Sequence, residues 1–158
     1  MACGIILSSY ICDLAGLVSA SGFPAGQLTL EVTEQVLLSD IQQAAQTLRA
    51  LAGQGVRIAL DDFGAGFCNF RYLKLLPLDY LKLDRSMIDG VVGDPRDLAV
   101  LRAIIAMAGA LDLQVIAEGV ESAAQRELVT SEGCAFYQGF LRAQPLSADE
   151  FAALAGRA

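Results

Sequence analysis

The chain alternates short β-rich runs with longer segments that can form helices, and this alternation constrains its fold more than any other feature. Because strands separated by helices form parallel sheets through right-handed crossovers, the pattern predicts an α/β fold with a parallel sheet. No Pro- or Ser-rich linker interrupts the 158 residues, so one continuous unit is expected. The expected strands are 28–33, 56–61, 79–84, 114–118 and 135–138.

Polar side chains recur near the C-terminal end of each expected strand. In the first strand Leu30 and Val32 point to one face and Glu31 to the other, and Ile58 and Asp61 are separated in the same way in the second. The carboxyl ends of parallel strands share one rim, which is where α/β proteins bind ligands. The sequence therefore predicts a site built from Glu31, Asp61, Asp62, Lys82, Asp84, Glu118 and Gln138.

Two adjacent aspartates end the apolar run IALDD and open into a glycine-containing turn. Like charges at the end of a buried strand destabilise the fold unless a cation or water compensates them. The chain has no histidine, which removes the commonest transition-metal ligand and the commonest general base. The carboxylates, amides and lysine that remain favour a hard cation, Mg²⁺ or Mn²⁺.

Each of these residues also has a purely structural interpretation. The aspartate pair fits a strand end and turn in which Asp62 caps the next helix. Lys82 and Asp84, two residues apart on one strand face, would form a structural ion pair. Glu121 would serve the first turn of a helix that starts near Ser122. Taken residue by residue, the sequence leaves these interpretations open beside the metal site.

Charge and hydropathy exclude two classes of partner. The net charge is −7 and no Lys or Arg precedes Arg49, so the chain lacks the basic stripe that follows polymeric DNA or RNA. The longest apolar candidate, Leu98 to Val115, is broken by Arg102 and Asp112, so no membrane segment is expected. The N-terminus lacks the positive start of a secretory signal, which predicts a cytoplasmic protein.

Five strings resemble, in order and spacing, successive motifs of the EAL domain, the cyclic di-GMP phosphodiesterase family. They are LTLEVTE, IALDDFGAGF, LPLDYLKLDRSMI, VIAEGVES and GCAFYQGF, within residues 28 to about 151. The resemblance implies a partial TIM-like (β/α) barrel that lacks the first strands of the EAL barrel. Residues 28–158 would be the C-terminal portion of an EAL domain, and residues 1–27 a poorly matched segment with a helix.

The resemblance also implies a function, the Mg²⁺- or Mn²⁺-dependent hydrolysis of cyclic di-GMP to linear pGpG. The implied metal ligands are Glu31 and Asp61 for one ion, and Asp62 and Asp84 for the second. The implied catalytic residues are Glu118, as general base, and Lys82, at a water- or metal-bridged position. The implied supporting residues are Glu121, Gln138 and Glu34, with a loop of Phe63, Gly64, Ala65 and Gly66 near the metals.

Two departures from the family pattern leave the activity open. The Glu-Ala-Leu signature is absent from the chain, and the only asparagine, Asn69, does not match the family's metal-binding asparagine. The chain is interpreted as an impaired phosphodiesterase, or alternatively as a non-catalytic remnant that binds a cyclic dinucleotide or another protein. A third alternative is a truncated product that does not fold alone. Unpaired strand edges in a partial barrel predict a homodimer or association with another signalling domain.

Overall fold

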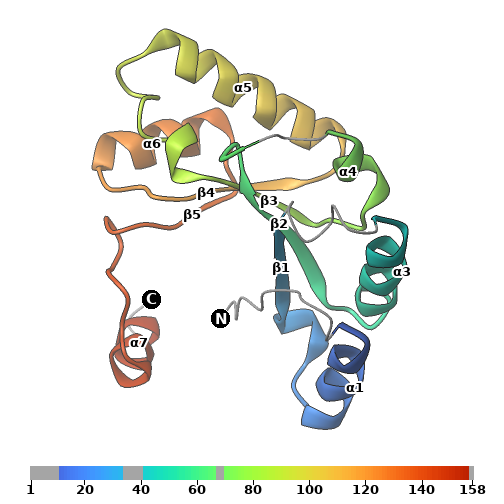
Figure 1. The fold of residues 1–158 in the computed structure, drawn as a ribbon. Helices are drawn as coiled ribbons and strands as arrows, with labels where there is room; N and C mark the ends of the chain where they lie inside the picture. The colour runs from blue at the N-terminus through green and yellow to red at the C-terminus, as the bar shows by residue number, and fades with distance from the viewer. Residues whose placement is uncertain (1–10, 34–40, 67–69, 157–158) are drawn as a thin grey trace.

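The computed structural model describes residues 11–33, 41–66 and 70–156 (Figure 1). The helices are α1 (Ile11–Ser21), η1 (Ala25–Gln27), α3 (Ile41–Ala52), α4 (Phe70–Leu75), η2 (Arg85–Met87), α5 (Pro95–Ala110), α6 (Ala123–Glu132) and α7 (Ala148–Ala155). The strands are β1 (Thr29–Thr33), β2 (Arg57–Phe63), β3 (Tyr80–Leu83), β4 (Gln114–Ala117) and β5 (Phe136–Tyr137). Strands and helices alternate along the chain, as the sequence predicts.

The five strands run parallel in one open sheet of order β1-β2-β3-β4-β5. Figure 1 shows α3, α4, α5 and α6 arranged around the outside of this sheet. The predicted α/β fold is therefore confirmed, and the open sheet corresponds to part of a TIM-like barrel. Strand β2 continues to Phe63, beyond its expected end at Asp61, and β5 is shorter than expected.

The hydrophobic core lies between the sheet and these helices. Leu30, Ile58, Leu81 and Val115 come from four successive strands, and none is more than 3% exposed. The helices complete the core with Leu48 and Leu51 of α3, Leu101 and Ala108 of α5 and Val129 of α6. Because side chains alternate along a strand, burying this set directs the intervening side chains, Glu31 among them, to the opposite face.

Helix α5 contains most of the long apolar stretch that begins at Leu98. Asp94 caps its N-terminus by accepting a hydrogen bond from the Arg96 N–H at 2.7 Å, and Pro95 occupies the first turn, where no intrahelical donor is needed. Arg102 binds both oxygens of Glu132 on α6, at 2.6 and 2.7 Å. Neither α5 nor any other helix in the described ranges is long and apolar enough to cross a membrane.

Candidate metal centre

A cluster of charged side chains occupies the rim at the carboxyl ends of the strands. Glu31 lies on β1, Asp61 on β2 and Lys82 on β3, while Glu118 directly follows β4 and Gln138 directly follows β5. Direct polar contacts connect all five of these side chains. The parallel register thus brings together residues from every strand of the sheet.

Lys82 is the centre of this cluster. Its Nζ atom lies 2.7 Å from Asp61 Oδ1, 2.9 Å from Glu31 Oε2 and 2.6 Å from Glu118 Oε1. Only 4% of Lys82 is exposed. Burial disfavours the ammonium, but the hydrogen bonds to Asp61, Glu118 and Glu31 outweigh it and raise the pKa of Lys82 above its ordinary value. The side chain is therefore a fixed positive charge.

A bulge in β2 explains how two adjacent aspartates reach the same site. The pairing of β2 with β3 passes from Leu60↔Leu81 to Phe63↔Leu83, so β2 holds one extra residue there. Asp62 takes a left-handed backbone conformation with φ 56°, which aspartate tolerates better than most residues. The bulge returns Phe63 to the core, where it is 6% exposed, and leaves both carboxylates at the rim.

Glu118 is held from two sides. Gln138 Nε2 donates to Glu118 Oε1 at 2.7 Å, and Lys82 Nζ contacts the same oxygen. Burial raises the pKa of Glu118, and the charges of Asp61 and Glu31 add to this effect, whereas the Lys82 ammonium opposes it. The result is a carboxyl group with a fixed orientation and a proton affinity above that of an ordinary glutamate.

The donor set fits a hard divalent cation. Asp61, Asp62 and Glu118 each offer a carboxylate oxygen, and these oxygens lie within 4.8 Å of one another. With Glu31, four carboxylates gather near one ammonium, so negative charge exceeds positive charge at the rim. Partial burial, then the charges of Asp61 and Asp84, raise the pKa of Asp62. Oxygen ligands and excess negative charge suit Mg²⁺ and Mn²⁺ alike.

Asp84 lies beside this cluster but is engaged by its own turn. It caps η2, where its Oδ1 accepts a hydrogen bond from the Ser86 N–H at 2.9 Å. The hydrogen bonds from Ser86 lower the pKa of Asp84. Within the described residues the ion pairs of Lys82 are with Glu31, Asp61 and Glu118, so the alternative of a Lys82–Asp84 pair is wrong.

Arg85, which no sequence motif indicated as a site residue, connects the segment after β3 to the loop after β4. Its Nη1 lies 2.8 Å from Glu121 Oε1, and its stem packs where a Cβ on Gly119 would stand. Gly119 follows Glu118 directly, so Arg85 holds the loop that carries Glu118 against the end of β3. Glu121 precedes the α6 cap Ser122 and lies outside the helix. The sequence feature that could have pointed to this role is that an arginine directly follows Asp84.

The remaining predicted residues lie at or beyond the edge of this site. Phe63, Gly64, Ala65 and Gly66 form the end of β2 and the turn after Asp62, and the Ala65 N–H donates to Asp62 O at 3.2 Å. Gly64 has φ 104° and leaves room for the side chain of Met87. Glu34 lies outside the described residues. The metal, catalytic and supporting roles of all these residues stay predictions.

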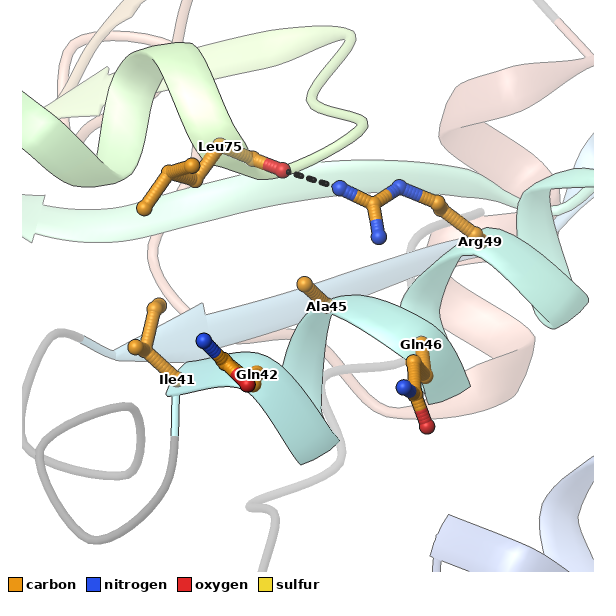
Figure 2. Close-up of a pocket in the computed structure, with 6 residues that line it drawn as sticks. All are labelled: Ile41, Gln42, Ala45, Gln46, Arg49 and Leu75. Atoms are coloured by element: carbon orange, nitrogen blue, oxygen red, sulfur yellow. Dashed lines mark hydrogen bonds between the residues drawn. The ribbon is translucent and has the colours of Figure 1, made fainter.

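Two surface cavities lined by described residues help to locate the site. The larger, about 1010 Å³, extends from Glu118 and Gln138 to α7, so the charged cluster opens onto it. The smaller, about 270 Å³, lies between α3 and α4, where Arg49 donates to the Leu75 carbonyl at 2.9 Å (Figure 2). Its lining residues are Ile41, Gln42, Ala45, Gln46, Arg49 and Leu75, and none of them carries a carboxylate. The larger cavity is the one that adjoins the acidic site.

An open parallel (β/α) sheet with an acidic cluster at its carboxyl rim defines a class of barrel-related proteins with a candidate metal site. The family model described as "EAL domain" matches residues 7–145. The chain belongs to the EAL domain family. The predicted family membership is thereby confirmed, whereas the division into residues 1–27 and 28–158 stays a prediction.

Named relatives and solved structures agree with this assignment. The chain is 42% identical over 126 residues to the bifunctional diguanylate cyclase/cyclic di-GMP phosphodiesterase MucR of Pseudomonas aeruginosa, covering 80% of this chain and 18% of MucR. It thus spans less than a fifth of that relative. The EAL domain of Mycobacterium smegmatis DcpA superposes with a TM-score of 0.90 at 37% identity, covering 99% of this chain and 72% of that one. The Klebsiella pneumoniae BlrP1 complex with manganese and cy-diGMP gives a TM-score of 0.78 at 27% identity, covering 90% and 38%.

Proposed function

We propose that this chain is part of a metal-dependent phosphodiesterase that hydrolyses cyclic di-GMP to linear pGpG with Mg²⁺ or Mn²⁺. The observation that carries the proposal is the rim cluster, in which Lys82 contacts three carboxylates and the oxygens of Asp61, Asp62 and Glu118 converge. The names of MucR and of the BlrP1 complex support the same substrate and a divalent ion.

Glu118 is the proposed general base. Its Oε1 is occupied by Lys82 and Gln138, so Oε2 is the better placed oxygen to accept a proton from the attacking water. The raised pKa of Glu118 makes it a stronger base than an ordinary glutamate. Gln138 acts by holding the carboxyl group in one orientation.

Lys82 and the aspartates have electrostatic roles that complement the proton transfer by Glu118. The raised pKa of Lys82 keeps it protonated, so it contributes a fixed positive charge near the phosphodiester and cannot serve as a base. Asp61 and Asp62 would hold the cation, with Glu31 and Asp84 as the further proposed ligands. When bound, the cation would acidify a water and neutralise the phosphodiester charge.

A non-catalytic role is the second candidate, and a sequence observation favours it. The given sequence contains no Glu-Ala-Leu signature, and its single asparagine, Asn69, does not match the family's metal-binding asparagine. A remnant of this kind would bind the cyclic dinucleotide, or another protein, without hydrolysing it. Both candidate functions are compatible with a cytoplasmic location and with pairing to a second copy or to another signalling domain. These two expectations stay predictions.

The two candidates are separated by measuring hydrolysis and binding on the same protein. The chain is incubated with cyclic di-GMP and Mn²⁺ or Mg²⁺, and pGpG is quantified by chromatography. We expect hydrolysis at least roughly a hundredfold slower than that of a complete EAL domain, comparable to the loss of one major electrostatic stabiliser. Glu118→Gln should abolish this residual rate, and Glu127→Gln, at an exposed position of α6, is the matched control.

Three other results of these measurements would change the conclusion. Saturable binding of cyclic di-GMP without any pGpG would favour the non-catalytic candidate. A rate equal to that of a complete domain, abolished by Glu118→Gln, would show that the absent ligands matter less than proposed. Hydrolysis that survives Glu118→Gln unchanged would refute the assignment of the general base.

A further inference from the structure

The side chain of Met87 packs against the turn that follows the aspartate pair. Gly64, at the start of this turn, has φ 104°, and a Cβ placed on it would lie 2.6 Å from Met87 Sδ. A side chain at position 64 has no room there, because the thioether of Met87 already fills the space. The sulfur of Met87 therefore lies against the backbone of the turn.

Backbone hydrogen bonds connect this contact to two of the proposed metal ligands. The Asp84 N–H donates to Phe63 O at 3.0 Å, and the Met87 N–H donates to Asp84 O at 2.9 Å. Asp62 directly precedes Phe63, so the segments that carry Asp62 and Asp84 form one packed unit. The contact between Met87 and Gly64 closes this unit on the side of the turn.

The sulfur of Met87 belongs to a residue that solvent reaches. Met87 packs against the hydrophobic core but is only partly buried. A thioether at such a position is open to small oxidants, which convert methionine to its sulfoxide. The sulfoxide is polar where the thioether is apolar, so its formation changes how the side chain packs.

We propose that Met87 is a site of reversible oxidation by hydrogen peroxide, and that its sulfoxide displaces the turn that follows Asp62. In this step a lone pair of Sδ attacks one peroxide oxygen, an S–O bond forms while the O–O bond breaks, and the other oxygen leaves as water. The thioether is oxidised and the peroxide is reduced. A methionine sulfoxide reductase reverses the step with a dithiol, which becomes a disulfide as the oxygen leaves as water.

The sulfoxide cannot keep the position of the thioether. The space between Met87 and Gly64 does not admit one additional carbon, so it does not admit an oxygen on the sulfur. Burying that oxygen without a hydrogen-bond donor is also unfavourable, so the oxygen is directed to water. The rotation of the side chain that this requires removes the thioether from Gly64, and the turn loses the contact that fixes it.

The inference rests on the candidate metal centre of the proposed function, but not on hydrolysis. Asp62 has a left-handed backbone conformation at the start of this turn, so a displaced turn carries its carboxylate away from Asp61 and Glu118. The oxidised protein should therefore bind the cation more weakly. The inference assigns to the metal centre a form of regulation, the loss of its cation under oxidising conditions.

The test compares the protein before and after treatment with hydrogen peroxide. Metal-free protein is oxidised, desalted, and analysed by peptide mass spectrometry, hydrogen exchange and Mn²⁺ calorimetry. We expect one added oxygen on Met87, faster amide exchange in residues 62–66, and at least roughly tenfold weaker Mn²⁺ binding, as when a group that supports a metal ligand is lost. A methionine sulfoxide reductase with a dithiol should restore the exchange rates and the affinity.

Two variants isolate the role of the sulfur. Met87→Leu has a similar volume without sulfur, so its Mn²⁺ affinity should be the same before and after peroxide. It retains all four cysteines, so any effect of cysteine oxidation would persist in it. Met107→Leu is the matched control, because Met107 is also partly buried against the core but lies on α5. This variant should respond to peroxide as the unmodified protein does.

Three results would overturn the proposal. They are the absence of sulfoxide at Met87, unchanged exchange in residues 62–66 when Met87 is oxidised, and an equal effect of peroxide on the Met87→Leu protein. Absence of Mn²⁺ binding before any oxidation would count against the proposed function alone, because mass spectrometry and hydrogen exchange still decide whether oxidised Met87 displaces the turn.

Discussion

Lys82 donates to Asp61 across the pairing of β3 with β2, with 2.7 Å between Nζ and Oδ1 and only 5% of the lysine side chain exposed. The same ammonium contacts Glu31 and Glu118, so one buried cation balances carboxylates from three other segments of the sheet. Removing one partner of a buried charge cluster costs more than the cluster contributes, because the charges left behind stay desolvated. The stability of the rim therefore depends on Lys82.

Replacing Lys82 with methionine should destabilise the protein strongly. We expect Lys82→Met to lower the free energy of unfolding by roughly 3 kcal/mol in metal-free buffer, because three partly buried carboxylates lose their cation. Added Mn²⁺ should restore part of this loss by supplying positive charge at the same rim. Urea unfolding with and without Mn²⁺ measures both effects.

Lys74→Met is the control, since Lys74 is exposed on α4 and the two are the only lysines in the chain. Equal destabilisation by the two substitutions would contradict the central role given to Lys82.

Metal binding should require the aspartate pair. Asparagine has nearly the same shape as aspartate and tolerates the left-handed backbone at position 62, so Asp61→Asn and Asp62→Asn change charge with little strain. Each should weaken Mn²⁺ binding at least tenfold in calorimetric titrations, because each removes a converging ligand. Affinity of the unmodified chain should stay well below that of a complete EAL domain.

Asp112→Asn serves as the matched control for this titration. Asp112 also has a positive φ, 57°, but follows α5 away from the rim. If Mn²⁺ binds as tightly to Asp61→Asn as to the Asp112→Asn protein, the rim is not the metal site.

The buried thiol of Cys134 should make stability depend on alkaline pH. Burial, followed by the nearby charge of Glu132, raises the pKa of Cys134 to about 11 from an ordinary value of 9.0. A raised pKa means that the native state favours the protonated thiol. Its contribution is therefore complete below pH 9 and is lost as the pH rises towards 11.

Comparison with Cys134→Ala isolates this effect from other groups that titrate at high pH. The unfolding free energy of the unmodified protein, relative to Cys134→Ala, should fall by about 1 kcal/mol between pH 7 and pH 10. Urea unfolding at several pH values provides the measurement. A difference that stays constant over this range would show that Cys134 titrates normally in the folded protein.

Strand number, order and direction could be predicted from the sequence because they follow from hydrophobic runs and their spacing. The site residues Glu31, Asp61 and Lys82 could be placed on one rim because side chains alternate along a strand. Strict alternation fails at Asp62, which it would direct towards the core beside Leu60. The bulge that corrects this depends on how β2 pairs with β3, and no local sequence pattern specifies that pairing.

The roles of Asp84 and Arg85 also could not be predicted from local sequence. The predicted strand extended to Asp84, but β3 ends at Leu83 and Asp84 caps η2 instead of pairing with Lys82. Arg85 contacts Glu121 and packs over Gly119, both far away in sequence, so its role follows from tertiary packing alone. Residues whose partners lie in a loop after a different strand could not be identified from the residues next to them in the sequence.

Gly139 should be intolerant of a side chain because two backbones meet there. A Cβ at this position would overlap the backbone of Val120, whose N–H donates to Gln138 O at 3.0 Å and whose carbonyl accepts from the Leu141 N–H at 3.1 Å. Gly139→Ala should therefore separate the end of β5 from the loop after Glu118, at a cost of roughly 2 kcal/mol. Because Gln138 would move with this backbone, its hydrogen bond to Glu118 should weaken and Mn²⁺ affinity should fall as well.

Gly93→Ala is the control, since no neighbouring heavy atom lies within 4 Å of its added Cβ. Urea unfolding and Mn²⁺ calorimetry on the two variants give the comparison, and equal stability of both would show that the contact between Gly139 and Val120 does not hold the site together.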